Sequence, residues 1–240
     1  MPKHAAPRVS APPVPESLTS SQRERRDRIV KAGLARLRTH EHTQIQMKDV
    51  AAEADVALGT VYRYFQSKDH LFAEVLADWA SHLRTNVERQ PLRGDTNAAR
   101  LTDVLHRSMR AFQSWPQLAR VVMALEASED PFTREIFARN MARNTDIYVE
   151  AVHGLPADVT RDVVRVANSV FDLQLRQWVV GAQSIAQVYD HISRAVWIVL
   201  EFSERGVVAP RPERPEPPET PDQPETPDQE EAVAGHVAHR

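Results

Sequence analysis

The chain has 240 residues, of which 42% are hydrophobic and 26% charged, and its formal net charge is −3. This composition is ordinary for a globular protein, and the length allows one large or two small cores. A membrane-spanning protein is excluded because no apolar run approaches the roughly 18 residues required, and the lack of cysteine excludes disulfides and thiolate chemistry. Because residues 1–7 also lack an apolar signal core, we expect a cytoplasmic protein.

Charge and proline are concentrated at the two ends. Residues 1–28 carry six basic against three acidic side chains, whereas residues 206–240 carry three against eight. Thirteen of the 17 prolines lie before residue 20 or after residue 207. Such segments bury too little apolar surface to offset the entropy of ordering, so we expect disorder at 1–19 and 206–240. The tandem Pro-Glu-Thr-Pro-Asp-Gln at 218–229 indicates either a plain solvated tail or one that binds a partner or mimics DNA.

The residues between these ends predict helices only. Apolar side chains recur at helical spacing, and no stretch alternates apolar and polar residues convincingly. The four internal prolines, at 91, 116, 131 and 156, stand where helices would begin or end. We therefore predict an all-α protein of about nine helices. These helices lie near 21–39, 46–53, 58–64, 68–89, 97–114, 116–127, 132–153, 157–181 and 184–203.

The first predicted helix has a capping signal and a basic start. Ser20 or Ser21 can cap it, and Glu24 stands three residues after Ser21 in a capping-box pattern. Arginines follow at 23, 25, 26 and 28, where positive charge opposes the helix dipole. They indicate either an anion nearby, such as a DNA phosphate, or a solvated face.

Residues 47–64 predict two short helices joined by a tight turn. From Met47 to Ala54 the apolar residues fall on one helical face, Asp55-Val-Ala interrupts the pattern, and a second helix follows from Leu58. Two brief helices separated by a turn of about three to four residues are typical of a helix-turn-helix. The side chains that we expect to face outward from the second helix are Thr60, Tyr62, Arg63 and Tyr64.

Two consecutive stretches carry a family resemblance: Val50-Ala-Ala-Glu-Ala-Asp-Val-Ala-Leu-Gly59 and Thr60-Val-Tyr-Arg-Tyr-Phe-Gln-Ser-Lys68-Asp-His-Leu71. They follow the pattern V-A-x-x-A-x-V-x-x-G-T-x-Y-x-Y-F-x-S-K-x-x-L, and the segment closely resembles the DNA-binding domain of TetR-family repressors. The resemblance covers about residues 21–72, under a quarter of the chain. It implies a transcriptional repressor, a homodimer whose recognition helices enter adjacent major grooves of a palindromic double-stranded DNA operator.

The resemblance also implies which residues touch DNA. Lys68 would contact phosphate with help from the helix dipole, and Gly59 would let backbone and DNA approach closely. Arg63 is the best candidate to read a guanine. Two alternatives stay open: Tyr64 belongs to the core, or Arg63 contacts only phosphate. The implied phosphate ligands are Gln46, Thr60, Tyr62, Tyr64 and Lys68, and the implied sequence-reading residues are Lys48, Leu58, Gly59 and Arg63.

The remainder of the chain shows no comparable motif. By resemblance, residues 20–67 form the helix-turn-helix domain and residues 68–205 a helical domain that binds an effector and dimerises. Large apolar side chains at helical spacing are usually core, but in TetR-like proteins this domain also encloses a ligand cavity. The candidate cavity residues are Trp79, Leu83, Met109, Phe112, Met123, Phe137, Met141, Phe171, Leu175 and Trp178. The resemblance makes helices 157–181 and 184–203 the dimer interface, with Val188, Ile192, Val196 and Trp197 as candidate contacts.

The effector is predicted only by chemical class. A mostly apolar interior suits a small hydrophobic or amphipathic molecule. Arg176, mid-helix among apolar residues, would meet either a ligand carboxylate or a salt-bridge partner on another helix. The stretches 46–57 and 62–68 are also similar to the steroid-catabolism repressors (KstR) of the same family, which would suit a lipid, sterol-derived or acyl-CoA-like effector.

Enzymatic motifs are absent from the sequence. None of the ten histidines forms a His-Glu-x-x-His or similar ligand set, and no nucleophile elbow, phosphate loop or dinucleotide fingerprint is present. We therefore expect no catalysis, no metal and no cofactor. A helical scaffold that binds only proteins is the alternative, but it leaves the 46–68 segment unexplained. Activation of transcription rather than repression also stays open.

Overall fold

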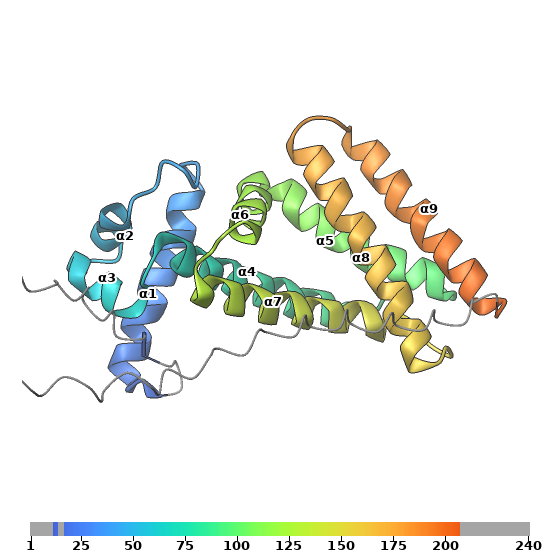
Figure 1. The fold of residues 1–240 in the computed structure, drawn as a ribbon, viewed down its shortest axis with the longest axis horizontal. Helices are drawn as coiled ribbons and strands as arrows, with labels where there is room; N and C mark the ends of the chain where they lie inside the picture. The colour runs from blue at the N-terminus through green and yellow to red at the C-terminus, as the bar shows by residue number, and fades with distance from the viewer. Residues whose placement is uncertain (1–11, 14–16, 207–240) are drawn as a thin grey trace, which may run out of the picture. The chain divides into compact units, whose positions relative to one another are not determined.

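Nine helices and no strand make up the part of the chain that the computed structural model describes, residues 12–13 and 17–206 (Figure 1). The all-α prediction is confirmed, and every predicted helix has a counterpart whose ends differ by at most three residues. Of the expected tails at 1–19 and 206–240, only residues 12–13, 17–19 and 206 lie within the described residues. The helices are α1 (Ser20–Leu37), α2 (Met47–Glu53), α3 (Leu58–Tyr64), α4 (Lys68–Glu88), α5 (Asn97–Ser114), α6 (Pro116–Glu126), α7 (Pro131–Glu150), α8 (Ala157–Val179) and α9 (Ile185–Glu204).

Proline and short polar side chains set the helix starts. Pro116 and Pro131 occupy the first turns of α6 and α7, where proline's missing N–H is not needed, and Pro156 precedes α8. The Ser184 side chain caps α9 by accepting a hydrogen bond from the backbone N–H of Gln187. These local signals explain why the predicted and observed boundaries agree closely.

The cap of α1 differs from the prediction. Thr19 is the cap: its Oγ1 accepts from the backbone N of Gln22 at 3.4 Å, and the Gln22 side-chain Oε1 accepts from the backbone N of Thr19 at 2.9 Å. The expectation of Ser20 or Ser21 is therefore wrong, because Gln22 rather than Glu24 completes the capping box. Leu18, just before the cap, is already buried.

Helices α1, α2 and α3 gather around the start of α4 (Figure 1). Val50 of α2, Val61 of α3 and Phe65 after α3 are fully buried in their shared core. Gly33 allows α1 to approach α4 closely, since a Cβ at this position would lie 3.0 Å from Cγ2 of Val75. The short helices thus obtain their stability from tertiary packing on α1 and α4.

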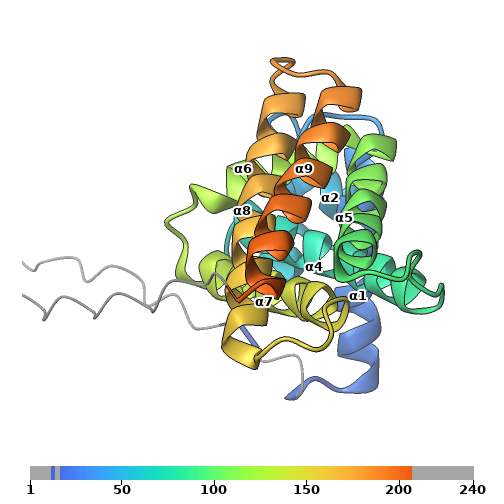
Figure 2. The same cartoon turned by 90° about the vertical axis from the view of Figure 1, so that its right-hand side faces the viewer.

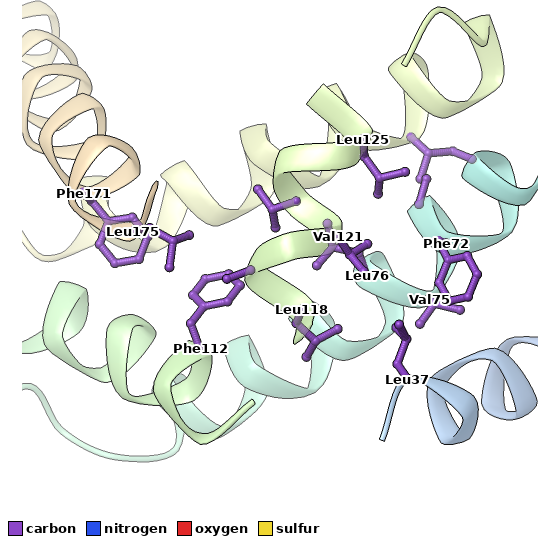
Figure 3. Close-up of a cluster of buried hydrophobic side chains, with 14 of the residues drawn as sticks. Leu37, Phe72, Val75, Leu76, Phe112, Leu118, Val121, Leu125, Phe171 and Leu175 are labelled. Carbon is purple, nitrogen blue, oxygen red and sulfur yellow. The ribbon is translucent and has the colours of Figure 1, made fainter. Parts of the chain in front are cut away.

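Helices α5 to α9 form a second group, which begins where α4 extends beyond the first three helices. Helix α4 packs against α5, α6 and α7 of this group. Figure 3 shows Leu37 of α1, Val75 of α4 and Leu118 of α6 converging in one cluster of buried side chains. The apolar core is therefore continuous from α1 through α4 to α6.

Helices α8 and α9 run side by side, and α9 also packs against α5 (Figure 2). They are joined by a short turn in which Gly181 has a φ of 75°, a left-handed conformation that favours glycine. Val188, Ile192, Val196 and Leu200 of α9 are all buried at helical spacing. This inner face of α9 belongs to the chain's own core.

The cap assignment can be tested by alanine substitution. We expect Thr19→Ala to lower the free energy of unfolding by about 1 kcal/mol, because the substitution leaves the Gln22 N–H without its acceptor. The control, Ser21→Ala in the same turn, should change it by less than about 0.5 kcal/mol. Urea unfolding measures both, and a larger loss for Ser21→Ala would move the cap to the position that the sequence suggested.

Candidate DNA-binding surface and effector pocket

Helix α3 presents one buried and one exposed face. Val61 and Tyr64 face inward, whereas Leu58 is 41% exposed and Tyr62 48% exposed. An added Cβ on Gly59 would meet no atom within 4 Å, so the surface at the front of α3 is flat and open. Five of the residues proposed for DNA contact therefore lie on this helix with accessible surface: Leu58, Gly59, Tyr62 and Arg63 are exposed, and Thr60 is half-buried.

Tyr64 does not face outward as expected. Only 3% of the residue is exposed, because it follows Val61 by three positions and shares its inward face. The alternative assignment of Tyr64 to the core is the one that fits. Its hydroxyl accepts a hydrogen bond from Nη2 of Arg63 at 3.1 Å, and the Arg63 guanidinium lies 5.0 Å from the Tyr64 ring centroid.

The start of α2 adds two exposed polar side chains, Gln46 and Lys48. The backbone N of Gln46 donates to Oδ2 of Asp49 at 3.0 Å, which holds the first turn in place. Asp49 also lies 3.9 Å from the Arg36 guanidinium of α1. The start of α2 is thereby tied to α1 while Gln46 and Lys48 stay open to a ligand.

Lys68, in the first turn of α4, is half-buried. Its Nζ donates to the backbone carbonyl of Thr43 at 3.3 Å, so the start of α4 lies beside the loop that leads to α2. Burial lowers the pKa of Lys68 below its usual value, and the neighbouring carboxylate of Asp69 opposes that shift. The predicted phosphate ligands Gln46 and Lys68 thus belong to adjoining segments.

The arginines of α1 divide between two roles. Arg26 pairs with Glu74 of α4 at 2.6 Å, and its guanidinium lies 5.2 Å from the Phe65 ring centroid. It is therefore committed to packing α1 on α4 and not available to an anion. Arg23 and Arg28 are exposed, which fits the solvated face that the sequence left open and keeps both side chains accessible to a phosphate.

A polar network joins the start of α4 to the loop between α6 and α7. The Ser67 hydroxyl caps α4 by accepting from the backbone N of His70 at 2.9 Å, and it donates to Oδ2 of Asp130 at 2.5 Å. Although burial acts in the opposite direction, hydrogen bonds from Ser67, Thr133 and the Phe132 N–H hold the pKa of Asp130 below its usual value. The cap of α4 therefore depends on a residue 63 positions away.

The same loop and the first turn of α7 make two further contacts with α4. The Ser128 hydroxyl donates to Oδ2 of Asp69 at 2.7 Å, and the His70 ring stacks on the Phe132 ring with 5.5 Å between centroids. Sequence reasoning missed this network. The Asp-Pro at 130–131 was a visible helix-start signal, but nothing in it indicated the long-range partner.

A cavity of about 50 Å³ lies among the helices of the second group. Six of the predicted cavity residues line it: Trp79, Leu83, Phe112, Met141, Phe171 and Leu175. Met109, Met123, Phe137 and Trp178 do not line this cavity. Met109, for example, is fully buried in the core. Helical spacing identifies an apolar face but not which part of that face borders a space.

Polar side chains also line the cavity, and sequence reasoning missed them. Nη1 of Arg84 donates to Oδ1 of Asn144 at 2.9 Å, and the Tyr148 hydroxyl donates to Oγ of Ser108 at 3.2 Å. Each of these residues, taken alone, has the sequence signature of an ordinary helix surface. Arg176 is different: it forms a salt bridge with Glu126 of α6, as one of the two alternatives predicted.

Asp172 is the acidic side chain of the cavity wall. It accepts from Nδ2 of Asn168 at 3.2 Å. Burial, followed by the negative charge of Glu126, raises the pKa of Asp172 to about 6, while Arg176 acts in the opposite direction. Burial also raises the pKa of the Tyr148 hydroxyl to about 12, so this side chain stays protonated as a donor.

The raised pKa of Asp172 predicts a pH-dependent stability. Because the carboxyl binds its proton more tightly in the folded chain than at its ordinary value of 3.8, it lowers the free energy of unfolding as pH rises from about 4 to 6. We expect Asp172→Asn to stabilise the protein by roughly 2 kcal/mol at pH 7.5, with a gain that shrinks as the pH falls through that interval.

Urea unfolding between pH 4 and 8 measures this effect. Asp190→Asn is the control, since Asp190 forms only an exposed pair with Arg194 and should change stability by less than about 1 kcal/mol. A gain for Asp172→Asn that is constant across the whole range would contradict the assignment.

The predicted dimer contacts on α9 need correction. Val188, Ile192 and Val196 are fully buried within the chain, so they cannot meet a partner. Trp197 is 59% exposed, as expected for a contact residue. The apolar stripe of α9 is wide, and its sequence did not reveal which part faces inward. The large apolar side chains exposed on α8, α9 and the turn between them are Val166, Leu173, Val180, Trp197, Ile198 and Phe202, a set that we call the α8–α9 face.

Within residues 12–13 and 17–206, no group of three or more His, Asp or Glu side chains is arranged to hold a metal ion. Over the same residues, no helix has the length and apolar character needed to cross a bilayer.

Comparisons with known proteins agree with this architecture. Residues 29–75 match the family model described as bacterial regulatory proteins, tetR family. The transcriptional repressor KstR of Mycobacterium tuberculosis is 30% identical over 210 residues, which is 83% of this chain and 91% of the relative. KstR of Rhodococcus jostii is 31% identical over 193 residues, covering 76% of this chain and 85% of the relative. Both are named as helix-turn-helix transcriptional repressors.

Solved structures show the same fold. A TetR transcriptional regulator from Rhodococcus superposes with a TM-score of 0.67 at 23% identity, over 75% of this chain and 98% of that chain. A tetR-family regulator from Streptomyces coelicolor gives a TM-score of 0.57 at 18% identity, over 76% and 83% of the two chains.

Proposed function

The chain belongs to the TetR family of bacterial regulatory proteins, and on that premise we propose that it represses transcription as a homodimer on a palindromic operator, from which a small hydrophobic or amphipathic effector releases it. The observation that carries this proposal is the exposed face of α3. A short helix packed on α1 and α2 presents Gly59 and Tyr62 outward with no covering element among the described residues.

The DNA contacts divide by chemistry. Phosphate contacts come from Gln46, Thr60, Tyr62 and Lys68, whose positions on α2, α3 and the start of α4 adjoin one another. Base contacts come from the exposed residues Lys48, Leu58, Gly59 and Arg63.

Operator binding is tested by selecting bound sequences from random DNA and measuring affinities for the selected site. We expect a palindrome. Tyr62→Phe, which removes only a hydroxyl from a phosphate contact, should weaken all sequences by about tenfold, while Arg63→Ala should relax the preference at one base pair of each half-site by about 1–3 kcal/mol.

Arg139→Gln, an exposed arginine of α7, is the control and should leave affinity unchanged. Selection of no preferred sequence would overturn the proposed function. A uniform loss for Arg63→Ala would instead make Arg63 a phosphate ligand.

Homodimerisation is proposed through the α8–α9 face. Trp197, Ile198 and Phe202 project from one end of α9 with roughly half of their surface exposed, although large apolar residues are usually covered. Aromatic side chains dominate the energetics of protein interfaces. A second copy of the chain is the occupant that a two-fold operator requires, because each half-site needs its own α3.

Sedimentation velocity tests this interface. Trp197→Glu should raise the dimer dissociation constant by about a hundredfold or more, because it places a charge in a desolvated contact. Leu58→Glu is the matched control, since Leu58 is also a large exposed apolar residue but lies on α3. A wild-type monomer at micromolar concentration, or a Trp197→Glu variant that assembles normally, would refute this part of the proposal.

Release of DNA is proposed to act through α4. Trp79, Leu83 and Arg84 of this helix line the cavity, and Lys68 at its other end adjoins the DNA-contacting segments. We suppose two positions of α4, one that binds DNA and one that does not. An effector shifts the equilibrium between them by no more than the difference in its binding free energy for the two. The network of Ser67 and Asp130 supplies a second point at which α4 is held.

A further inference from the structure

Arg84 stands out among the polar side chains of the cavity wall. Its Nη1 donates to Oδ1 of Asn144 at 2.9 Å and to Oδ1 of Asn140 at 3.4 Å. Both acceptors are neutral amides, and none of the ion pairs found among residues 17–206 includes Arg84. A guanidinium has five N–H donors, and within those residues neither Nε nor Nη2 of Arg84 has a hydrogen-bond partner. The cavity wall therefore carries a cation whose Nε and Nη2 donors remain available to a ligand.

A second unsatisfied donor lies beside Arg84. Asn140 is only 4% exposed, and its Nδ2 has no hydrogen-bond partner among the described residues, although its Oδ1 accepts from Arg84. A buried donor without an acceptor is costly, and native structures contain few of them. Among the described residues, Nε and Nη2 of Arg84 and Nδ2 of Asn140 thus have no acceptor oxygen.

The rest of the cavity wall is mainly apolar, with Trp79, Leu83, Phe112 and Phe171 among its side chains. A mostly apolar wall with a few polar groups that fix orientation is typical of small-molecule sites. The apolar side chains of such a wall can contact the hydrocarbon part of a ligand, and Arg84 can donate hydrogen bonds to a negatively charged oxygen at its end.

Asp172 places a carboxyl group in the same cavity wall that holds the Arg84 guanidinium. The charged groups that face Asp172 are Glu126 and Arg176, whereas those that face Arg84 are Arg143, Glu88 and Asp146. Among residues 17–206, no hydrogen bond or ion pair joins Asp172 to Arg84: Asp172 accepts from Asn168, whereas Arg84 donates to Asn140 and Asn144. An anion in the cavity would be repelled by Asp172 and attracted by Arg84, with Arg143 adding to that attraction and Glu88 and Asp146 opposing it.

We propose that the effector is an apolar molecule ending in a carboxylate, and that Arg84 binds this carboxylate beside Asn144, which also lines the cavity. This inference rests on the proposed function, since it names the chemistry of the molecule that the cavity takes. A paired guanidinium and carboxylate form charge-assisted hydrogen bonds that are stronger than neutral ones. An alcohol or a neutral ester of the same length lacks that contribution and binds less tightly.

Calorimetric titration with matched probes tests the inference. The probes are straight-chain saturated fatty acids of 8 to 16 carbons, each paired with the primary alcohol of the same length. At pH 7.5, we expect the full-length dimer to bind at least one acid about tenfold or more tightly than its alcohol. Arg84→Gln should lower the affinity for the acid to about that for the alcohol.

Two further variants distinguish the loss of the Arg84 charge from a general loss of folded structure. Arg139→Gln removes an exposed arginine from α7 and should leave the acid preference intact. Arg84→Lys keeps the charge without the guanidinium fork, so it should retain part of the preference even if Arg84→Gln folds poorly. The thermal midpoint of each variant is measured alongside.

Three results would overturn the inference: acid and alcohol bind the wild type equally, the acid preference survives in Arg84→Gln, or no acid of the panel binds. Operator affinity measured on the same samples separates this failure from that of the proposed function. A protein that binds its operator but shows no acid preference refutes only the carboxylate assignment. A protein that binds no operator refutes the repressor proposal whatever the acids do.

Discussion

The close packing of α4 against α1 is the constraint on which the rest of the structure depends. Gly33 lets the two helices approach until an added Cβ would lie 3.0 Å from Val75, and Arg26 pairs with Glu74 across the same contact. Because α4 is one uninterrupted helix from Lys68 to Glu88, its far end extends into the second group of helices. Arg84 follows Lys68 by 16 positions, which corresponds to about 24 Å at 1.5 Å per residue. This single helix joins the cavity wall to the segments proposed to contact DNA without any additional linkage.

The sequence predicted helices better than it predicted which way side chains face. Prolines and caps punctuate the chain, so the helix boundaries followed from local chemistry. Orientation was less secure, because Tyr64 and Val188 lie on helices whose apolar stripes are wide enough to serve two purposes. Arg84 was missed for a different reason. A single arginine within a helix has the signature of a solvated surface, and only tertiary structure places it beside a cavity and two asparagine amides.

The cavity also bears on how an effector acts. About 50 Å³ is well below the volume of roughly 300 Å³ or more that drug-sized ligands occupy. A molecule of that size must displace side chains such as Trp79 and Phe112, whose rings lie 5.0 Å apart between centroids. The displaced side chains belong to α4 and α5, so a ligand of that size requires local rearrangement of both helices' cavity-facing side chains. The measured affinity of any effector then equals its contact energy less the cost of that rearrangement.

The contact between Arg63 and Tyr64 has a consequence for sequence recognition. In this conformation the guanidinium already donates to the tyrosine hydroxyl and lies over the aromatic ring. Reading a guanine would therefore be an exchange of partners, and the gain is the difference between two favourable interactions. That difference makes discrimination smaller than the strength of an arginine–guanine pair suggests. In return, the side chain is held near α3 before DNA arrives, so less conformational entropy is lost when it binds.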